Sequence, residues 1–205
     1  MKEKQLILAA RIISMVFTPL YLSLVGMIVL FMFSYLSLLP PSYKLTVLGI
    51  VYLFTILLPT LLIHLYRRNQ GWSPIDLGRK DRRMGPYIIS ILCYFACFYV
   101  MGIYHIPHFM ASILMAALMI QIVCALINLM WKISTHSAAI GGVAGALLAF
   151  SAIFMFNPVW WFCMVLIVAG MVGSSRMILR QHTLPQVIGG FIAGLLVAYL
   201  VVLFL

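Results

Sequence analysis

Long stretches without charged residues dominate this chain. No Asp, Glu, Lys or Arg occurs in five runs, which are Ile12–Tyr43, Leu45–Tyr66, Met84–Trp131, Ile133–Ser175 and Gln181–Leu205. A helix that crosses a bilayer needs about 20 consecutive apolar residues. The first, second and fifth runs each have room for one such helix, and the third and fourth are each long enough for two.

Helix-breaking residues divide the two longest runs. Gly102, His105, Pro107 and His108 interrupt the third run, and Asn157-Pro158 interrupts the fourth, because a residue before proline is disfavoured in a helix. Alternation with a period of two, the pattern of a strand, is absent. We therefore predict an all-α transmembrane bundle of about seven spans (six or seven), at 6–36, 44–66, 86–104, 109–131, 137–156, 158–178 and 185–205.

Composition supports a membrane protein over a soluble one. Hydrophobic residues make up 65% of the 205 residues and charged residues 8%, whereas a soluble domain has about 25% charged residues. The first apolar run is far longer than the roughly 7–15 residues of a signal peptide's apolar region, so we expect a retained helix. We predict one integral membrane domain over 1–205, with a basic interfacial loop at 67–85.

The net charge of +10 is distributed unevenly across the predicted spans. With seven spans, Lys44 lies on one side, and the other twelve basic residues lie on the opposite side with the N-terminus. The positive-inside rule makes the basic face cytoplasmic, and its charges also favour anionic membrane lipids. A membrane-embedded chain with one short basic loop offers no groove for nucleic acid, so we exclude that partner. The four cysteines fall inside predicted spans and are interpreted as packing residues.

Three polar segments fall on the basic face of the seven-span arrangement. They are Arg79–Pro86, Lys132–Ser137 and Ser174–Gln186. Clustered cations in the first segment are suited to phosphate binding, although an anchor loop has the same pattern. In the second, Ser134 or Thr135 is the expected N-cap of a helix whose free N–H groups attract anions, and an ordinary capped helix is the alternative. In the third, a short connection brings Arg176 close to His182, as a phosphoryl-transfer pair requires, and the alternative is a snorkelling Arg beside a turn His.

The three segments together resemble the signature of the type 2 phosphatidic acid phosphatase family, which shares its site with the vanadium haloperoxidases. The family's third motif is Ser-Arg, five residues, His, three residues, Asp, and its spacing is kept by Ser175-Arg176, His182 and Gln186. The second motif, Pro-Ser-Gly-His, corresponds to Ile133-Ser134-Thr135-His136. The first motif is Lys, six residues, Arg-Pro, and here Pro86 is kept while Gly85 and Gly78 replace the Arg and the Lys.

This resemblance implies a membrane-embedded phosphatase that hydrolyses a lipid phosphate or prenyl diphosphate without a metal or other cofactor. It implies that His182 forms a phosphohistidine and that His136 protonates the leaving group. Gln186 would orient His182. The phosphate oxygens would be held by Arg176, Ser134, Thr135, Lys80, Arg82 and Arg83. Members of the family commonly act on the outer or periplasmic face, whereas the charge distribution here favours the cytoplasmic face of the cell (inner) membrane.

Gln186 stands where the family has Asp, and this difference leaves two functions open. An amide can accept a hydrogen bond from His182, but it lacks the negative charge that stabilises a cationic histidine. Loss of one such charge in a partly dry site costs a few kcal/mol of transition-state stabilisation. The alternative to the phosphatase is therefore a weakly active or inactive relative that binds lipid phosphates.

Overall fold

The computed structural model describes residues 2–33, 35–71 and 80–205, and within these it leaves the side chains of residues 2, 33, 35, 80 and 81 undescribed. It is all-helical over the described residues. Its α-helices are α1 (Lys2–Val16), α2 (Pro19–Phe33), α3 (Pro41–Tyr52), α4 (Leu58–Asn69), α5 (Met84–Ile103), α6 (His108–Met130), α7 (Thr135–Phe154), α8 (Val159–Ile178) and α9 (Leu184–Phe204). Two 3-10 turns, η1 (Tyr35–Leu38) and η4 (Lys80–Arg83), and a π-helical turn, η2 (Leu53–Leu57), complete it.

The number of spans agrees with the prediction. Six helices in the described part are long and apolar enough to cross a membrane, and α1 with α2 makes a seventh if the pair is one span. The segment α3–η2–α4 is continuous over Pro41–Asn69, since the π-helical turn joins its two halves. The expected breaks near Pro107 and Asn157-Pro158 are present, between α5 and α6 and between α7 and α8.

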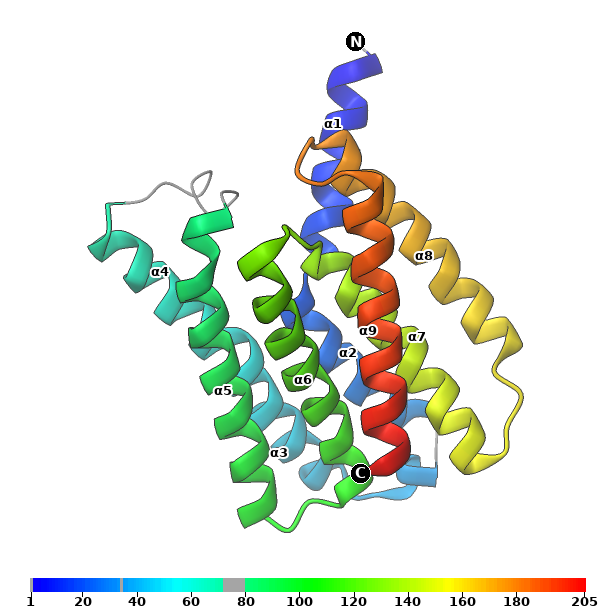
Figure 1. Cartoon of the computed structure of the whole chain (residues 1–205). Helices are drawn as coiled ribbons and strands as arrows, with labels where there is room; N and C mark the ends of the chain where they lie inside the picture. Colours follow the sequence, from blue (N-terminus) through cyan, green and yellow to red (C-terminus); the bar gives the residue numbers. More distant parts are fainter. Residues whose placement is uncertain (1, 34, 72–79) are drawn as a thin grey trace.

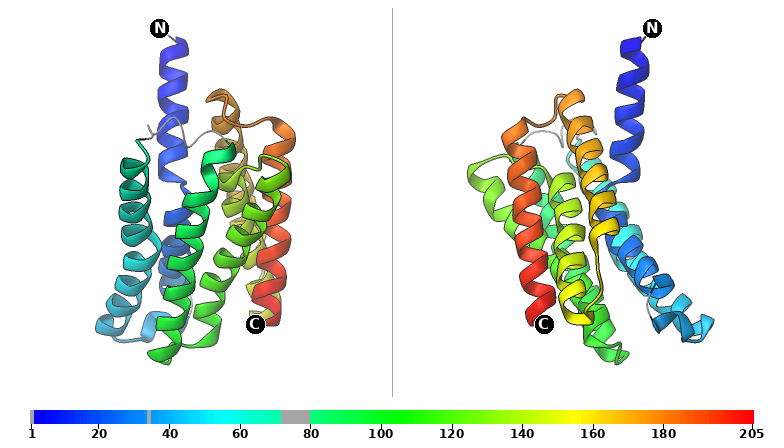
Figure 2. Two further views of the ribbon diagram at one scale, coloured as in Figure 1. Left: turned by 60° about the vertical axis from the view of Figure 1, so that its left-hand side comes forward. Right: turned by 90° about the vertical axis from the view of Figure 1, so that its right-hand side faces the viewer.

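The prediction of a single helix over 6–36 is wrong. This segment is divided into α1 and α2, which are bent by 59° at Phe17 and Thr18. The physical cause is Pro19, which has no N–H to donate and disfavours a helical Thr18 before it. As a result α1 leaves the direction of α2 and packs against α8 (Figure 2).

The helix connections gather at two ends of the bundle. Figure 1 shows the N-terminus, the α6–α7 connection and the α8–α9 connection toward one end, and the C-terminus and the α5–α6 connection toward the other. Helices α7 and α9 therefore run parallel, with their N-termini at the same end. Residues 67–71 and 80–85 of the predicted loop 67–85 lie toward this end too, and residues 72–79 are outside the described part.

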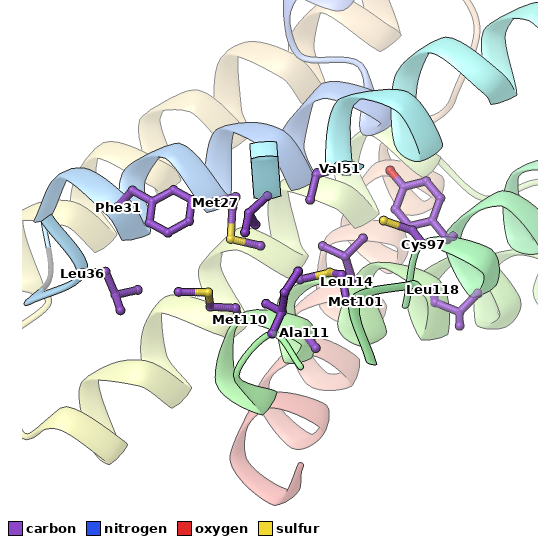
Figure 3. Close-up of a cluster of buried hydrophobic side chains, with 13 residues drawn as sticks. Met27, Phe31, Leu36, Val51, Cys97, Met101, Met110, Ala111, Leu114 and Leu118 are labelled. Carbon is purple, nitrogen blue, oxygen red and sulfur yellow. The ribbon is translucent and has the colours of Figure 1, made fainter. Parts of the chain in front are cut away.

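Two hydrophobic clusters hold the helices together. One joins α2, α3, α5 and α6, and Figure 3 shows Met27 and Phe31 facing Met101, Met110 and Leu114 within it. Cys97 belongs to this cluster, and all four cysteines are free thiols. The other cluster joins α5, α6, α7 and α9, and it lies next to the polar segments at the N-terminal end of α7.

Glycines allow α7 and α9 to pack backbone against backbone. A Cβ added to Gly194 would overlap the carbonyl oxygen of Ala138, and one added to Gly145 would overlap that of Leu195. A Cβ at Gly141 or Gly190 would likewise overlap a backbone oxygen of the other helix or its cap. Gly141 and Gly145 in α7, and Gly190 and Gly194 in α9, therefore form two Gly-x-x-x-Gly pairs, which membrane helices use for close approach. This parallel contact fixes the N-termini of α7 and α9 side by side.

Candidate phosphate-binding site

The N-terminus of α7 is closed by Ser134. This residue is fully buried, and its Oγ accepts the Ser137 N–H at 3.4 Å and lies 2.9 Å from the Ser137 hydroxyl. Ser134 is thus the N-cap, one of the two residues that the sequence analysis expected, and Thr135 begins the helix. The first N–H groups of α7 point toward the same end of the bundle as the α8–α9 connection.

A Schellman turn at the end of α8 explains the spacing between Arg176 and His182. Gln181 N donates to Arg176 O at 3.0 Å, and Arg180 N donates to Met177 O at 2.9 Å. Arg180 takes the left-handed conformation, φ 53°, that this motif requires. His182 N also lies 3.4 Å from Arg176 O, so the turn folds His182 back over the last turn of α8.

The N-terminus of α9 is a capping box that also orients His182. Thr183 is the N-cap, its side chain accepts the Gln186 N–H, and Gln186 Oε1 accepts the Thr183 N–H at 3.2 Å. The same Oε1 lies 3.1 Å from His182 Nδ1. The Thr183 N–H donates to this side-chain atom of Gln186, so the atom is the amide oxygen, which can only accept hydrogen bonds. Nδ1 of His182 must therefore be the donor and carry the ring proton. The lone pair of His182 is then on Nε2.

The two helix N-termini are connected directly. Ser134 N donates to Gln186 O at 3.3 Å, so the N-cap of α7 is bonded to the first turn of α9. Gly190 allows this, because a Cβ there would lie 2.5 Å from Ser134 O. The second and third polar segments of the sequence therefore form one unit.

Arg83 brings the first polar segment to this unit. Its Nη1 donates to Ile133 O at 3.2 Å and its Nη2 donates to Thr135 Oγ1 at 3.4 Å. Arg82 is half-buried in the same turn, η4, and the side chain of Lys80 lies outside the described part. Pro86 is in the first turn of α5, as predicted.

Arg176 is buried without a carboxylate beside it among the described side chains. It is 8% exposed, its Nη1 donates to Ser14 Oγ at 2.7 Å, and its Nε is buried with no hydrogen-bond partner. The only acidic side chain in the described part is Glu3, which is exposed in the first turn of α1. A buried cation in this situation is costly, and an anion would offset the cost.

His136 faces the same group of residues from the first turn of α7. It lies close enough to Arg176, His182 and Arg83 to interact with their charges, and it borders the backbone of Ser14. Its Nδ1 is buried and has no hydrogen-bond partner. Both histidines of the sequence motifs therefore belong to one cluster.

The environment keeps His182 uncharged. Burial lowers the pKa of His182 to about 3, and the positive charges of Arg83 and Arg176 act in the same direction. The hydrogen bond to Gln186 opposes this effect only in part. Burial, followed by the charges of Arg83 and Arg176, also lowers the pKa of Lys132, which shows that the cations of this cluster repel one another. The site is therefore strongly electropositive around a neutral imidazole.

Sequence reasoning missed Ser14, which lies in α1 and reaches Arg176 across 162 positions of the chain. It also did not single out Ser137, although that residue is buried and bonded to Ser134. The polar character of Ser14 within an apolar run was the only signal for it.

No family model, curated protein or solved structure matches this chain.

Proposed function

We propose that this protein is a membrane-embedded phosphatase that hydrolyses a lipid phosphate or prenyl diphosphate through a phosphohistidine at His182. The observation that carries the proposal is the buried Arg176, whose Nε has no partner, beside a neutral His182 that Gln186 orients. An unneutralised guanidinium calls for an anion, and an imidazole with a free Nε2 lone pair is a nucleophile.

In the first step, His182 Nε2 attacks phosphorus and the bond from phosphorus to the leaving oxygen breaks. Once the negative phosphate lies among the cations it favours a protonated His136, and His136 gives this proton to the leaving oxygen, which departs as an alcohol or a phosphate. His182 keeps its Nδ1 proton and becomes a phosphorylated cation. In the second step, water attacks phosphorus, His136 takes a proton from the water, and His182 leaves as the neutral imidazole. The cycle returns both histidines to their starting states.

The surrounding groups favour the charge that develops on phosphorus. Arg176, Arg83 and Lys132 act on His182 electrostatically and would act likewise on a phosphate beside it. The N-termini of α7 and α9 add the positive ends of two helix dipoles, which lie side by side because Ser134 N bonds Gln186 O. Such fixed donors stabilise a transition state without having to reorganise.

The choice of a lipid substrate follows from the position of these groups. They lie at the ends of helices that are long and apolar enough to cross a membrane. A phosphate carried by a hydrocarbon chain would be held at this depth by the bilayer itself. By the positive-inside rule, we expect the site to open to the cytoplasmic face, and cysteine labelling at positions 67 and 106 would test that orientation.

A second candidate function is binding of a lipid phosphate without turnover. It is favoured by Gln186, because the phosphorylated His182 would be a cation that faces a neutral amide rather than a carboxylate. Arg83 and Arg176 would further oppose positive charge on the ring. Binding needs only the cations and helix N-termini, so it would survive the loss of turnover.

One experiment separates these functions. The full chain in detergent is assayed for phosphate release from phosphatidic acid, phosphatidylglycerol phosphate and undecaprenyl diphosphate, with His182→Ala and the control His105→Ala. His105 is exposed in the α5–α6 connection at the opposite end. We expect release that His182→Ala abolishes and His105→Ala leaves intact. Release from none of the three lipids, or release unaffected by His182→Ala, would overturn the phosphatase.

A further inference from the structure

Arg176 is anchored by a residue from the other end of the chain. Its Nη1 donates to Ser14 Oγ over 2.7 Å, and Ser14 is 7% exposed. Arginine carries five N–H donors in a rigid planar fork, so fixing one nitrogen fixes the directions of the others. The buried Nε, which has no partner, is therefore held in a defined orientation.

Ser14 reaches Arg176 only because α1 is bent away from α2. Ser14 lies in the last turn of α1, just before the 59° bend that Pro19 causes. The bend directs α1 against α8, where Arg176 lies in the last turn. In Figure 2, α1 stands clear of the line of α2 and meets the bundle at its C-terminal end.

The same turn of α1 borders the second histidine. The backbone of Ser14 lies beside the ring of His136. Ser14 is thus next to two groups that have an unpartnered buried nitrogen, Arg176 with its Nε and His136 with its Nδ1. A packing residue at a helix crossing would not need a hydroxyl there, since alanine fills a similar volume.

We propose that Ser14 is a positioning residue that aims the Arg176 guanidinium at a bound phosphate. Its Oγ accepts from Nη1 and leaves Nε–H for a phosphate oxygen, so α1 completes the anion site. This inference rests on the proposed function in that it takes the ligand of Arg176 to be the phosphate of a lipid. It differs from that function in requiring anion binding and not turnover.

The test uses the full chain in detergent. Titration calorimetry measures its affinity for orthovanadate, a phosphate mimic, and a second assay measures the kinetics of phosphate release. Loss of a hydrogen bond to a charged group lowers affinity by roughly tenfold or more, and we expect this in Ser14→Ala. Ser14→Thr keeps the hydroxyl and should bind orthovanadate nearly as tightly as the wild type. Ser14→Val has the shape of the threonine variant without its hydroxyl and should bind orthovanadate more weakly. The Thr and Val pair decides the matter if Ser14→Ala fails to fold.

A double-mutant cycle separates positioning from packing. In an Arg176→Ala background, Ser14→Ala should cause no further loss of vanadate affinity, because the group that it positions is gone. Ser23→Ala is the matched control, since Ser23 is 5% exposed and bonds Tyr94 instead. Additive losses, or equal affinities of Ser14→Thr and Ser14→Val, would overturn the proposal. If the variants change vanadate affinity as expected and no lipid is hydrolysed, the proposed phosphatase function fails and the role of Ser14 stands. If lipid is hydrolysed and Ser14→Ala changes neither hydrolysis nor vanadate affinity, the phosphatase function stands and the role of Ser14 fails.

Discussion

Gln186 Oε1 lies 3.1 Å from Nδ1 of His182 and accepts the N–H of Thr183 at 3.2 Å. One oxygen therefore serves two functions: it closes the capping box of α9 and it sets the tautomer of His182. A carboxylate in this position would keep both hydrogen bonds and add a negative charge, and this difference can be tested directly.

Gln186→Glu should raise the rate of phosphate release. Glutamate has the length of glutamine, so it can keep both hydrogen bonds, and its charge would stabilise a phosphorylated His182 cation. We expect an increase of about tenfold, which corresponds to about 1.4 kcal/mol. Gln186→Leu should lower the rate, measured in the same assay.

Thr183→Ala is the control for the helix cap. It removes one half of the capping box and leaves the Gln186–His182 contact in place. If Thr183→Ala lowers the rate as much as Gln186→Leu does, then Gln186 acts through the helix and not through His182.

Replacing Arg83 by Gln should raise the pKa of His182. After burial, the charge of Arg83 is the largest effect that holds this pKa near 3, below the ordinary value of 6.5. Imidazole nitrogen shifts in ¹⁵N-histidine NMR, assigned with His182→Gln, would follow the titration. Arg68→Gln, an exposed cation at the end of α4, should leave it unchanged. An unchanged His182 titration in Arg83→Gln would contradict the proximity of the two groups.

The same shift predicts how stability depends on pH. The folded pKa of His182 is depressed, so between pH 6.5 and about 3 the unfolded chain binds a proton that the folded site rejects. The contribution of a neutral His182 to the free energy of unfolding is therefore complete above pH 6.5 and decreases as the pH falls toward 3. Thermal unfolding in detergent should show a smaller loss of stability below pH 6 in His182→Gln than in wild type.

Some features of the site could be predicted from the sequence because they are local. The spacing of Arg176 and His182 is that of a helix end and a tight turn, and Ser134 stands where a helix must begin. The breaks at Pro107 and Pro158 follow from backbone chemistry alone. These predictions need no knowledge of how the helices pack.

Other features depend on packing and could not be predicted. Pro19 can be tolerated within a membrane helix, so the sequence alone does not show that α1 turns toward α8 and brings Ser14 to Arg176. Several basic residues precede α5, and the conformation of η4 decides which of them reaches Thr135. In the structure Arg83 does so.

Gly194→Ala should destabilise the protein, whereas Gly170→Ala should not. A Cβ at Gly194 would overlap the backbone oxygen of Ala138, while one at Gly170 meets nothing within 4 Å. Overpacking of this kind typically costs about 1–3 kcal/mol, and Gly to Ala in an open helix position gains up to about 1 kcal/mol. Thermal unfolding in detergent would compare the two. Equal stabilities would contradict the close contact of α7 and α9 that joins Ser134 to Gln186.

Replacing Arg180 by Gly should stabilise the turn that carries His182. Arg180 has a φ of 53°, a left-handed conformation that costs a residue with a Cβ roughly 1–2 kcal/mol and costs glycine almost nothing. Arg180→Ala is the matched control, since it removes the same exposed charge and keeps the Cβ. We expect Arg180→Gly to unfold at a higher temperature than Arg180→Ala, with phosphate release at least equal in rate, because the Arg176–His182 geometry is kept. A lower unfolding temperature for the glycine variant would mean that this turn does not adopt the Schellman geometry in the membrane protein.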